Sequence, residues 1–161
     1  MTGRCLYLAA VALALSGEAC AQARPTCPVV PKSLAAMKNC FRPLLVFSAS
    51  GDDLRLKRQV ALLDAAADDM MDRFVLFTPI VPDGRRVSTP ADSPYTILSK
   101  EQMKAVREQF HIALGEFTVL LVDEDGSVKL RAAAPVNVDR LNALIDKTPQ
   151  RKAEMQRPHA N

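Results

Sequence analysis

Two continuous apolar stretches, separated by a segment with helical spacing, most constrain what this chain can fold into. The first is "PLLVFSA" at residues 43–49 and the second is "RFVLFTPIV" at residues 73–81. Apolar runs of this length without alternation are typical of strands that are covered on both faces. Between them, apolar residues recur at intervals of four and three, as one buried helix face requires. These residues are Leu56, Val60, Leu63, Ala67 and Met70. The order strand, helix, strand predicts a βαβ unit.

The rest of the chain predicts two more helices and a hairpin. The segment "LSKEQMKAVREQFHI" (98–112) has one apolar face, and Ser99 with Gln102 predicts a capping box at its start. The segment "FTVLLVDEDGSVKLRA" (117–132) indicates two strands joined at an Asp-Gly turn. "NVDRLNALID" (137–146) predicts a closing helix. The order β-α-β-α-β-β-α predicts an α/β fold with a small mixed β-sheet and helices on both faces, the thioredoxin-like arrangement.

The junction "SASGDD" (48–53) lies where the first strand meets the first long helix. A helix N-terminus in this position can stabilise a reactive thiolate, but the junction contains no cysteine. Ser50 and Asp53 instead predict a capping box, and both Asp52 and Asp53 suit the positive end of the helix dipole. Neither Ser48 nor Ser50 has the flanking glycines of a nucleophile elbow. The junction therefore predicts a helix cap with no catalytic residue.

The N-terminal segment predicts a cleaved secretory signal. Arg4 precedes the short apolar stretch "CLYLAAVALAL", and Ala21 and Ala23 supply the small-x-small pattern of a cleavage site. The alternatives are an uncleaved anchor or a lipoprotein signal at Cys20, although Glu18 fits an apolar lipobox poorly. We therefore expect a periplasmic or secreted protein. Its expected parts are a signal peptide (1–23), an extended lead-in (24–38), one domain (39–147) and a basic C-terminal tail (148–161).

Removal of the signal leaves two of the four cysteines, Cys27 and Cys40. An even pair in an oxidising compartment predicts a structural disulfide. Such a bond stabilises a fold by about 3 kcal/mol in the chain-entropy description. The alternative is a thiol-disulfide oxidoreductase or a peroxiredoxin-like enzyme that uses Cys27 and Cys40 from a non-standard position. Their spacing is not Cys-x-x-Cys and neither residue opens a recognisable helix, so the structural disulfide is the favoured interpretation.

Four segments carry a family resemblance: "RPLLVFSAS" (42–50), "LKRQVALLDAA" (56–66), "REQFHIALGEFTVLLVDEDGSVKLR" (107–131) and "LNALIDKTPQRKAEM" (141–155). Together they resemble the domain of unknown function 4174 family, a secreted thioredoxin-like domain also found in vertebrate extracellular-matrix proteins of the sushi-repeat type. The resemblance covers residues 39–155 and implies a thioredoxin-like fold without an established activity. Thioredoxin chemistry would need a cysteine within residues 48–53 and a proline near Gly115 or Glu116, and both are absent.

A basic surface is the main candidate for binding a partner. Lys129 and Arg131 alternate with apolar residues on the second hairpin strand, and Arg151 and Lys152 lie in the tail. If the tail folds back beside this strand, the four side chains predict a site for an acidic protein or an anionic glycan. The alternative is that Lys129 and Arg131 only protect an edge strand from pairing with another chain.

Other function classes find little support in the sequence. A net charge of +3, without aromatic residues beside the basic ones, disfavours nucleic-acid binding, and no second apolar run reaches membrane-spanning length. The segment 123–127 lacks the distal glutamate of a calcium loop, and His111 and His159 lack partners at metal-ligand spacing. We expect no metal and no cofactor. The predicted function is that of an exported, non-catalytic binding or structural module.

Overall fold

The fold is built on one four-stranded sheet with the strand order β2-β1-β3-β4. The computed structural model describes residues 27–82 and 87–156, so the predicted signal peptide and His159 lie outside the described residues. The strands are β1 (Arg42–Phe47), β2 (Val75–Ile80), β3 (Thr118–Val122) and β4 (Val128–Ala132). β1 pairs with β2 in parallel, whereas β3 runs antiparallel to both β1 and β4. The predicted βαβ unit followed by a hairpin is confirmed.

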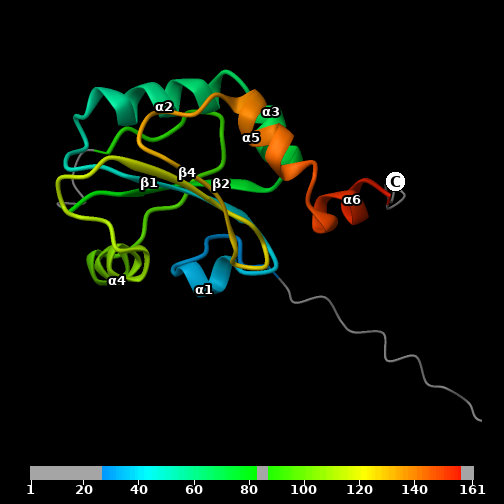
Figure 1. Ribbon diagram of the computed structural model, residues 1–161, viewed down its shortest axis with the longest axis horizontal. Helices are drawn as coiled ribbons and strands as arrows, with labels where there is room; N and C mark the ends of the chain where they lie inside the picture. Colours follow the sequence, from blue (N-terminus) through cyan, green and yellow to red (C-terminus); the bar gives the residue numbers. More distant parts are fainter. Residues whose placement is uncertain (1–26, 83–86, 157–161) are drawn as a thin grey trace, which may run out of the picture.

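Helices cover both faces of this sheet (Figure 1). One face carries α2 (Leu54–Asp64), α3 (Ala67–Asp72) and α5 (Val138–Ile145), and the other carries α1 (Leu34–Met37) and α4 (Lys100–Phe110). Alternate residues of β1 point into two separate cores, Leu44 and Val46 into the first and Leu45 and Phe47 into the second. Because both faces of β1 are buried, its sequence is continuously apolar after Arg42.

The helix expected from Asp53 through Met70 is broken into α2 and α3, which corrects the prediction of a single helix. The break falls at Ala65 and Ala66, residues that favour helix, so their helix propensity does not explain it. The Ser93 hydroxyl donates a 2.8 Å hydrogen bond to the carbonyl of Leu63. This is the carbonyl that would accept from residue 67 in a continuous helix. The same carbonyl accepts a 3.0 Å hydrogen bond from the N–H of Ala66, so a tight local turn and the contact with the loop at Ser93 coincide where α2 ends.

Both ends of the predicted domain contain short helices. The lead-in holds α1, whose N-cap Ser33 accepts a hydrogen bond from the backbone N–H of Ala36, so it is not wholly extended. The basic tail contains α6 (Pro149–Met155), which begins after the N-cap Thr148. In Figure 1, α6 lies beyond α5 at one end of the sheet. Among the described residues, none of the helices has the length and apolar character needed to cross a membrane.

Candidate functional site

The β1–α2 junction forms a closed set of capping contacts. The buried Ser48 hydroxyl lies 3.1 Å from Asp53 Oδ2 and 3.0 Å from the carbonyl oxygen of Ser50. Asp53 is the N-cap of α2, because its Oδ1 accepts a 2.8 Å hydrogen bond from the backbone N–H of Arg55. The predicted capping residue, Ser50, accepts instead from the N–H of Asp52. The cap is confirmed, but its side chain is that of Asp53, not Ser50.

Arg55 adds a charge-assisted contact to this cap. Its Nη2 lies 2.7 Å from Asp53 Oδ2, and its guanidinium carbon lies 4.6 Å from the centre of the Phe117 ring. The hydrogen bond from the Arg55 side chain is the main reason that the pKa of Asp53 falls from 3.8 to about 2, and the hydrogen bonds from the Arg55 N–H and Ser48 add to it. Asp53 is therefore held as an anion whose oxygens are both occupied, which suits a cap and not a general base.

Replacing Asp53 with alanine is expected to lower the free energy of unfolding by about 1 kcal/mol, the usual cost of losing an N-cap. Because the pKa of Asp53 is lowered in the folded protein, its carboxylate contributes to the free energy of unfolding above its ordinary pKa of 3.8. This contribution is lost as the pH falls toward about 2. Urea unfolding of wild type and variant across this pH range should therefore show a difference that shrinks on acidification. Asp52→Ala, a change at the exposed neighbouring carboxylate, is the matched control and should have little effect. A difference that stayed constant with pH would contradict the assignment.

Arg107 of α4 lies at the C-terminal ends of β1 and β2, near the β1–α2 junction but on the opposite face of the sheet from α2. Its Nη2 donates 2.8 Å hydrogen bonds to the carbonyls of Ser48 and Ile80, which directly follow β1 and end β2. Its Nη1 donates to the carbonyl of Ala113, in the loop where a thioredoxin would carry its proline. One buried guanidinium thus ties two strand ends to this loop. Sequence reasoning missed Arg107, although an arginine directly after the buried Val106 on an apolar helix face was an available signal.

Cys27 and Cys40 form a disulfide. Cys40 lies two residues before β1, whereas the junction with Ser48 follows the other end of this strand. A six-residue strand spans roughly 20 Å, so the disulfide and the junction lie at opposite edges of the sheet. Cys27 is exposed and Cys40 is buried. The predicted disulfide is confirmed, at a position remote from the N-terminus of α2.

A buried arginine stands at the same edge as the disulfide. Arg42, the first residue of β1, is fully buried and contacts three carboxylates. Its Nε lies 3.0 Å from Asp123 Oδ1, its Nη1 3.2 Å from Glu124 Oε1, and its Nη2 2.7 Å from Glu154 Oε1. Burial lowers the pKa of Arg42, but the hydrogen bond to Glu154 and the charges of all three acids outweigh burial and raise it. Burial, reinforced by Glu154 and Asp123, raises the pKa of Glu124 despite the opposing charge of Arg42.

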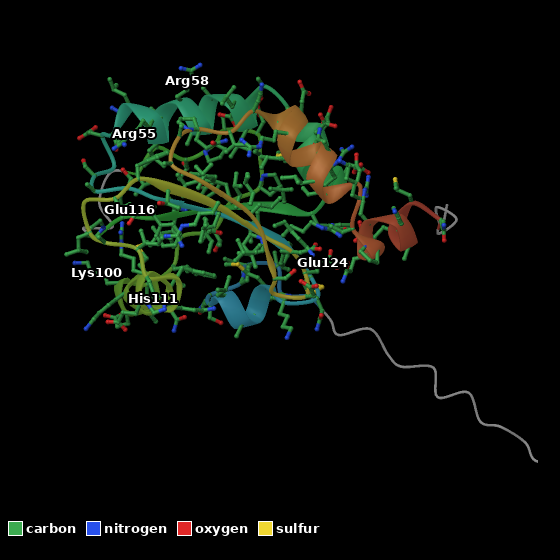
Figure 2. The ribbon with its side chains drawn as sticks, viewed as in Figure 1. Arg55, Arg58, Lys100, His111, Glu116 and Glu124 are labelled. Atoms are coloured by element: carbon green, nitrogen blue, oxygen red, sulfur yellow. A yellow bond between two sulfur atoms is a disulfide. The ribbon has the colours of Figure 1, made fainter. Side chains whose placement is uncertain are left out.

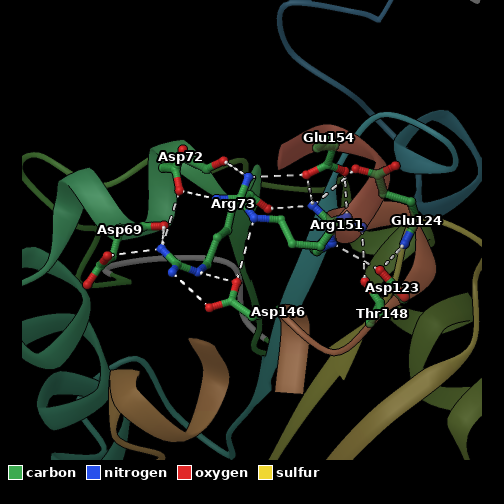
Figure 3. Close-up of polar contacts among 10 residues, drawn as sticks. Asp69, Asp72, Arg73, Asp123, Glu124, Asp146, Thr148, Arg151 and Glu154 are labelled. Carbon is green, nitrogen blue, oxygen red and sulfur yellow. Dashed lines mark hydrogen bonds and ion pairs between the residues drawn. The ribbon is translucent and has the colours of Figure 1, made fainter. Parts of the chain in front are cut away.

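Two further arginines extend these contacts to the helices, as Figure 3 shows. Arg151 of α6 pairs with the carboxylate of Asp72, donates a 2.8 Å hydrogen bond to the Asp72 carbonyl, and lies 3.3 Å from Glu154 Oε2. Arg73, which follows α3, contacts Asp146 Oδ1 and Asp69 Oδ1, each at 3.0 Å. We call the residues that make these contacts the arginine–carboxylate network. Its members are Arg42, Asp69, Asp72, Arg73, Asp123, Glu124, Asp146, Arg151 and Glu154. It fastens α6 to α3, α5, β1 and the β3–β4 hairpin.

The network corrects the predicted basic surface, because it removes Arg151 from the exposed side chains. The Arg151 side chain is only 8% exposed and its charge is paired. Lys129 and Arg131 lie on β4, with Lys129 Nζ 3.6 Å from Asp123 Oδ2 and Arg131 Nη2 3.6 Å from Glu116 Oε1. Lys152 is exposed on α6. The structure therefore does not bring the four predicted residues together as free charges.

The acidic residues of the β3–β4 turn serve as partners for basic and backbone groups. Asp123 and Glu124 bind Arg42, and Asp125 Oδ1 accepts a hydrogen bond from the backbone N–H of Ser127.

His111 forms the C-cap of α4 in the left-handed conformation, with φ of 54°. Within residues 27–82 and 87–156, no group of three or more histidine, cysteine or carboxylate side chains has the arrangement needed to hold a metal ion.

Solved structures with a similar fold include two Plasmodium proteins and one from Bacteroides sp.. The reduced 2-Cys peroxiredoxin of Plasmodium vivax is 17% identical, with a TM-score of 0.56, over 74% of this chain and 84% of that chain. Thioredoxin peroxidase I of Plasmodium yoelii is also 17% identical, with a TM-score of 0.56, over 80% and 84% of the two chains. A thiol:disulfide interchange protein from Bacteroides sp. is 17% identical, with a TM-score of 0.50, over 76% and 82%. At these identities the similarity shows the fold alone.

The sequence comparison identifies the family. No curated protein matches the chain significantly. The model of the family described as "Domain of unknown function (DUF4174)" matches residues 33–154, which is well over half of the chain. The matched range includes the β1–α2 junction, Arg107 and every member of the arginine–carboxylate network. The chain therefore belongs to the DUF4174 family, and its fold is a thioredoxin-like α/β fold.

Proposed function

We propose that this chain is a non-catalytic thioredoxin-fold module that binds or organises a partner outside the cytoplasm. One observation carries the non-catalytic part of the proposal. At the N-terminus of α2, where a thioredoxin-fold enzyme would need a thiol, Ser48, Asp53 and Arg55 bind one another and the backbone. The junction supplies no thiol, and the side chains of Ser48 and Asp53 are already engaged in these contacts.

A second candidate function is thiol-disulfide exchange by Cys27 and Cys40. One feature favours it: Cys27 is exposed, so an external thiolate could approach its sulfur. In that reaction the thiolate would form a mixed disulfide with Cys27 and release the sulfur of Cys40 as the leaving group. A second external thiolate would then attack the mixed disulfide, which joins the two external sulfurs and leaves both Cys27 and Cys40 reduced. The Cys27–Cys40 bond would reform by the same steps in reverse, with another disulfide as the oxidant. The described helix nearest to this pair in the sequence, α1, has only four residues and is too short to lower a thiol pKa strongly.

Turnover separates the two functions. With dithiothreitol supplied as the reductant, we expect the purified protein to reduce the disulfides of insulin no faster than the Cys27→Ser/Cys40→Ser double variant does. Dithiothreitol at low concentration should leave the Cys27–Cys40 bond intact, as thiol labelling and mass spectrometry would show. Rapid stoichiometric reduction together with cysteine-dependent turnover would replace the first proposal with the second.

Export and the partner form the rest of the proposal. Support for export comes from the signal-like residues 1–23 and from the Cys27–Cys40 disulfide, a bond typical of oxidising compartments. Of the predicted basic surface, Lys152 is exposed and Arg131 has about half of its side chain exposed, and we propose that Arg131 contacts an acidic protein or an anionic glycan. Capture of one specific partner that is lost in Arg131→Glu, but retained in Arg58→Glu on α2, would support this role. The occurrence of related modules in vertebrate matrix proteins stays a prediction of the sequence resemblance.

A further inference from the structure

A cavity of about 840 Å³ lies along α4 at the edge of the sheet that carries Arg107. Volumes of this size are typical of sites for small organic ligands. The cavity is lined by residues that recur at intervals of three and four along α4, by the following loop, and by Pro82 after β2. Its described lining contains no cysteine, so a ligand held there would bind independently of any exchange at Cys27 and Cys40.

Arg107 is the unusual group in this cavity. The residue is 6% exposed, and all of its hydrogen bonds among the described residues go to backbone carbonyls, which carry no net charge. Its Nε is buried and has no hydrogen-bond partner in the described part of the chain. Burying a cation without a paired anion is costly, and buried polar groups are normally satisfied. The guanidinium also lies 5.5 Å from the centre of the Phe47 ring, a contact that carries no counter-charge, so an anion in the cavity would supply the negative charge that the contacts of Arg107 lack.

Arg42, another buried arginine, differs from Arg107 because it has carboxylate partners. Arg42 contacts three carboxylates, and the net effect is a raised pKa. For Arg107, burial lowers the pKa, and the opposing charge of Glu116 is too weak to reverse the shift. Within the described ranges, this chain therefore pairs Arg42 with carboxylates at one edge of the sheet and leaves the charge of Arg107 at the other edge without a bound acid.

The rim of the cavity carries further positive charge. Lys100 and Lys104 line it together with Arg107, and Glu108 is the one acidic residue among its described lining. The Lys104–Glu108 contact is long, at 3.8 Å, between side chains that are mostly exposed, so it neutralises Lys104 only weakly. Figure 2 shows Lys100 and His111 on α4, on the opposite side of the molecule from Arg58 of α2. Three cations against one acid favour an anionic occupant.

Apart from His111, the remaining described lining is apolar. Met103 and Ile112 are buried core residues that border the cavity, and Leu114, beyond them on the loop, is 66% exposed. An exposed leucine beside a cationic rim would gain from contact with an apolar group. The cavity therefore combines the charged groups of Lys100, Lys104 and Arg107 with apolar atoms of Met103, Ile112 and Leu114.

We propose that this cavity binds a small organic carboxylate with an apolar body. The carboxylate accepts hydrogen bonds from Lys100 and Lys104 at the rim and supplies the counter-charge that Arg107 lacks. The apolar body packs against Ile112 and Leu114. Charge and apolar surface are both required, which separates this site from a general anion site and from a purely apolar groove.

The test compares ligands that share an apolar body. Octanoate, 1-octanol and octylammonium are titrated into the purified protein by isothermal titration calorimetry, with inorganic phosphate as the anion without an apolar body. We expect octanoate to bind, and the other three to bind about tenfold more weakly or not at all, because each lacks the charge or the apolar body. Equal binding of 1-octanol, equal binding of phosphate, or no binding of octanoate would overturn the proposal.

Two matched charge reversals locate the site. Lys104→Glu on the cavity rim should weaken octanoate binding about tenfold, whereas Arg58→Glu, an identical change in net charge on α2, should leave it unchanged. Both residues are exposed, so both variants should keep wild-type melting temperatures. In methyl NMR spectra, octanoate should shift the signals of Met103 and Ile112 but not that of Met71, an exposed methionine on α3. Equal losses in the two variants, no loss in Lys104→Glu, or shifts at Met71 alone would each refute the assignment.

Discussion

Replacing Arg42 with leucine is expected to lower the free energy of unfolding by roughly 3–5 kcal/mol, the range for breaking a buried ion pair by removing one partner. The fully buried guanidinium of Arg42 is the shared partner of Asp123, Glu124 and Glu154. Without it, three carboxylates remain close together at the edge of the sheet with no common counter-charge. Urea unfolding followed by circular dichroism would measure the loss.

Controls distinguish this effect from the loss of any arginine. Arg58→Leu, at an exposed position of α2, should change the free energy of unfolding by no more than about 0.5 kcal/mol. The double variant Arg42→Leu/Glu154→Leu should be less destabilised than the sum of its single variants, because the second change removes one of the unpaired acids. A loss below about 1 kcal/mol in Arg42→Leu, or strict additivity in the double variant, would show that the ion pairs contribute little.

The Cys27→Ser/Cys40→Ser double variant is expected to lose about 3 kcal/mol of stability, because the bond closes a loop with a sequence separation of 13 residues. Wild-type protein kept fully reduced should show the same midpoint of urea unfolding as the variant. This result would mark the bond as structural. A redox couple placed for catalysis would instead leave stability nearly unchanged on reduction, so an unaltered midpoint would contradict the expectation.

Patterns of apolar residues predicted most of the fold. β1 and β2 were predictable because both of their faces are buried, which makes each run mostly apolar, and β4 because the apolar Val128, Leu130 and Ala132 alternate with Lys129 and Arg131. These signals are local and depend on burial alone. The break between α2 and α3 could not be predicted in this way, because it coincides with a contact between the Ser93 hydroxyl and Leu63 across 30 residues of sequence.

Electrostatic partners were the main features that the sequence could not predict. Arg151 lies in a polar segment of the sequence, where an exposed side chain is expected. It is nevertheless buried against Asp72, 79 residues earlier. Arg107 interrupts an apolar helix face, which indicates that its side chain has a special role, but not that its partners are the carbonyls of Ser48 and Ile80. Pairing over such separations is decided by the tertiary fold, because charged side chains carry no periodic signal of their own.

The disulfide and α6 both lie beside the start of β1, and this determines which part of the domain faces a support when the protein is immobilised or fused. Cys40 precedes Arg42 by two residues, and Arg42 in turn holds Glu154 of α6. A surface, resin or fused protein joined to either end of the folded unit would therefore sit at this edge of the sheet. The α4 cavity at the far edge would stay open to solution, so immobilised protein should be suitable for ligand screening in either orientation.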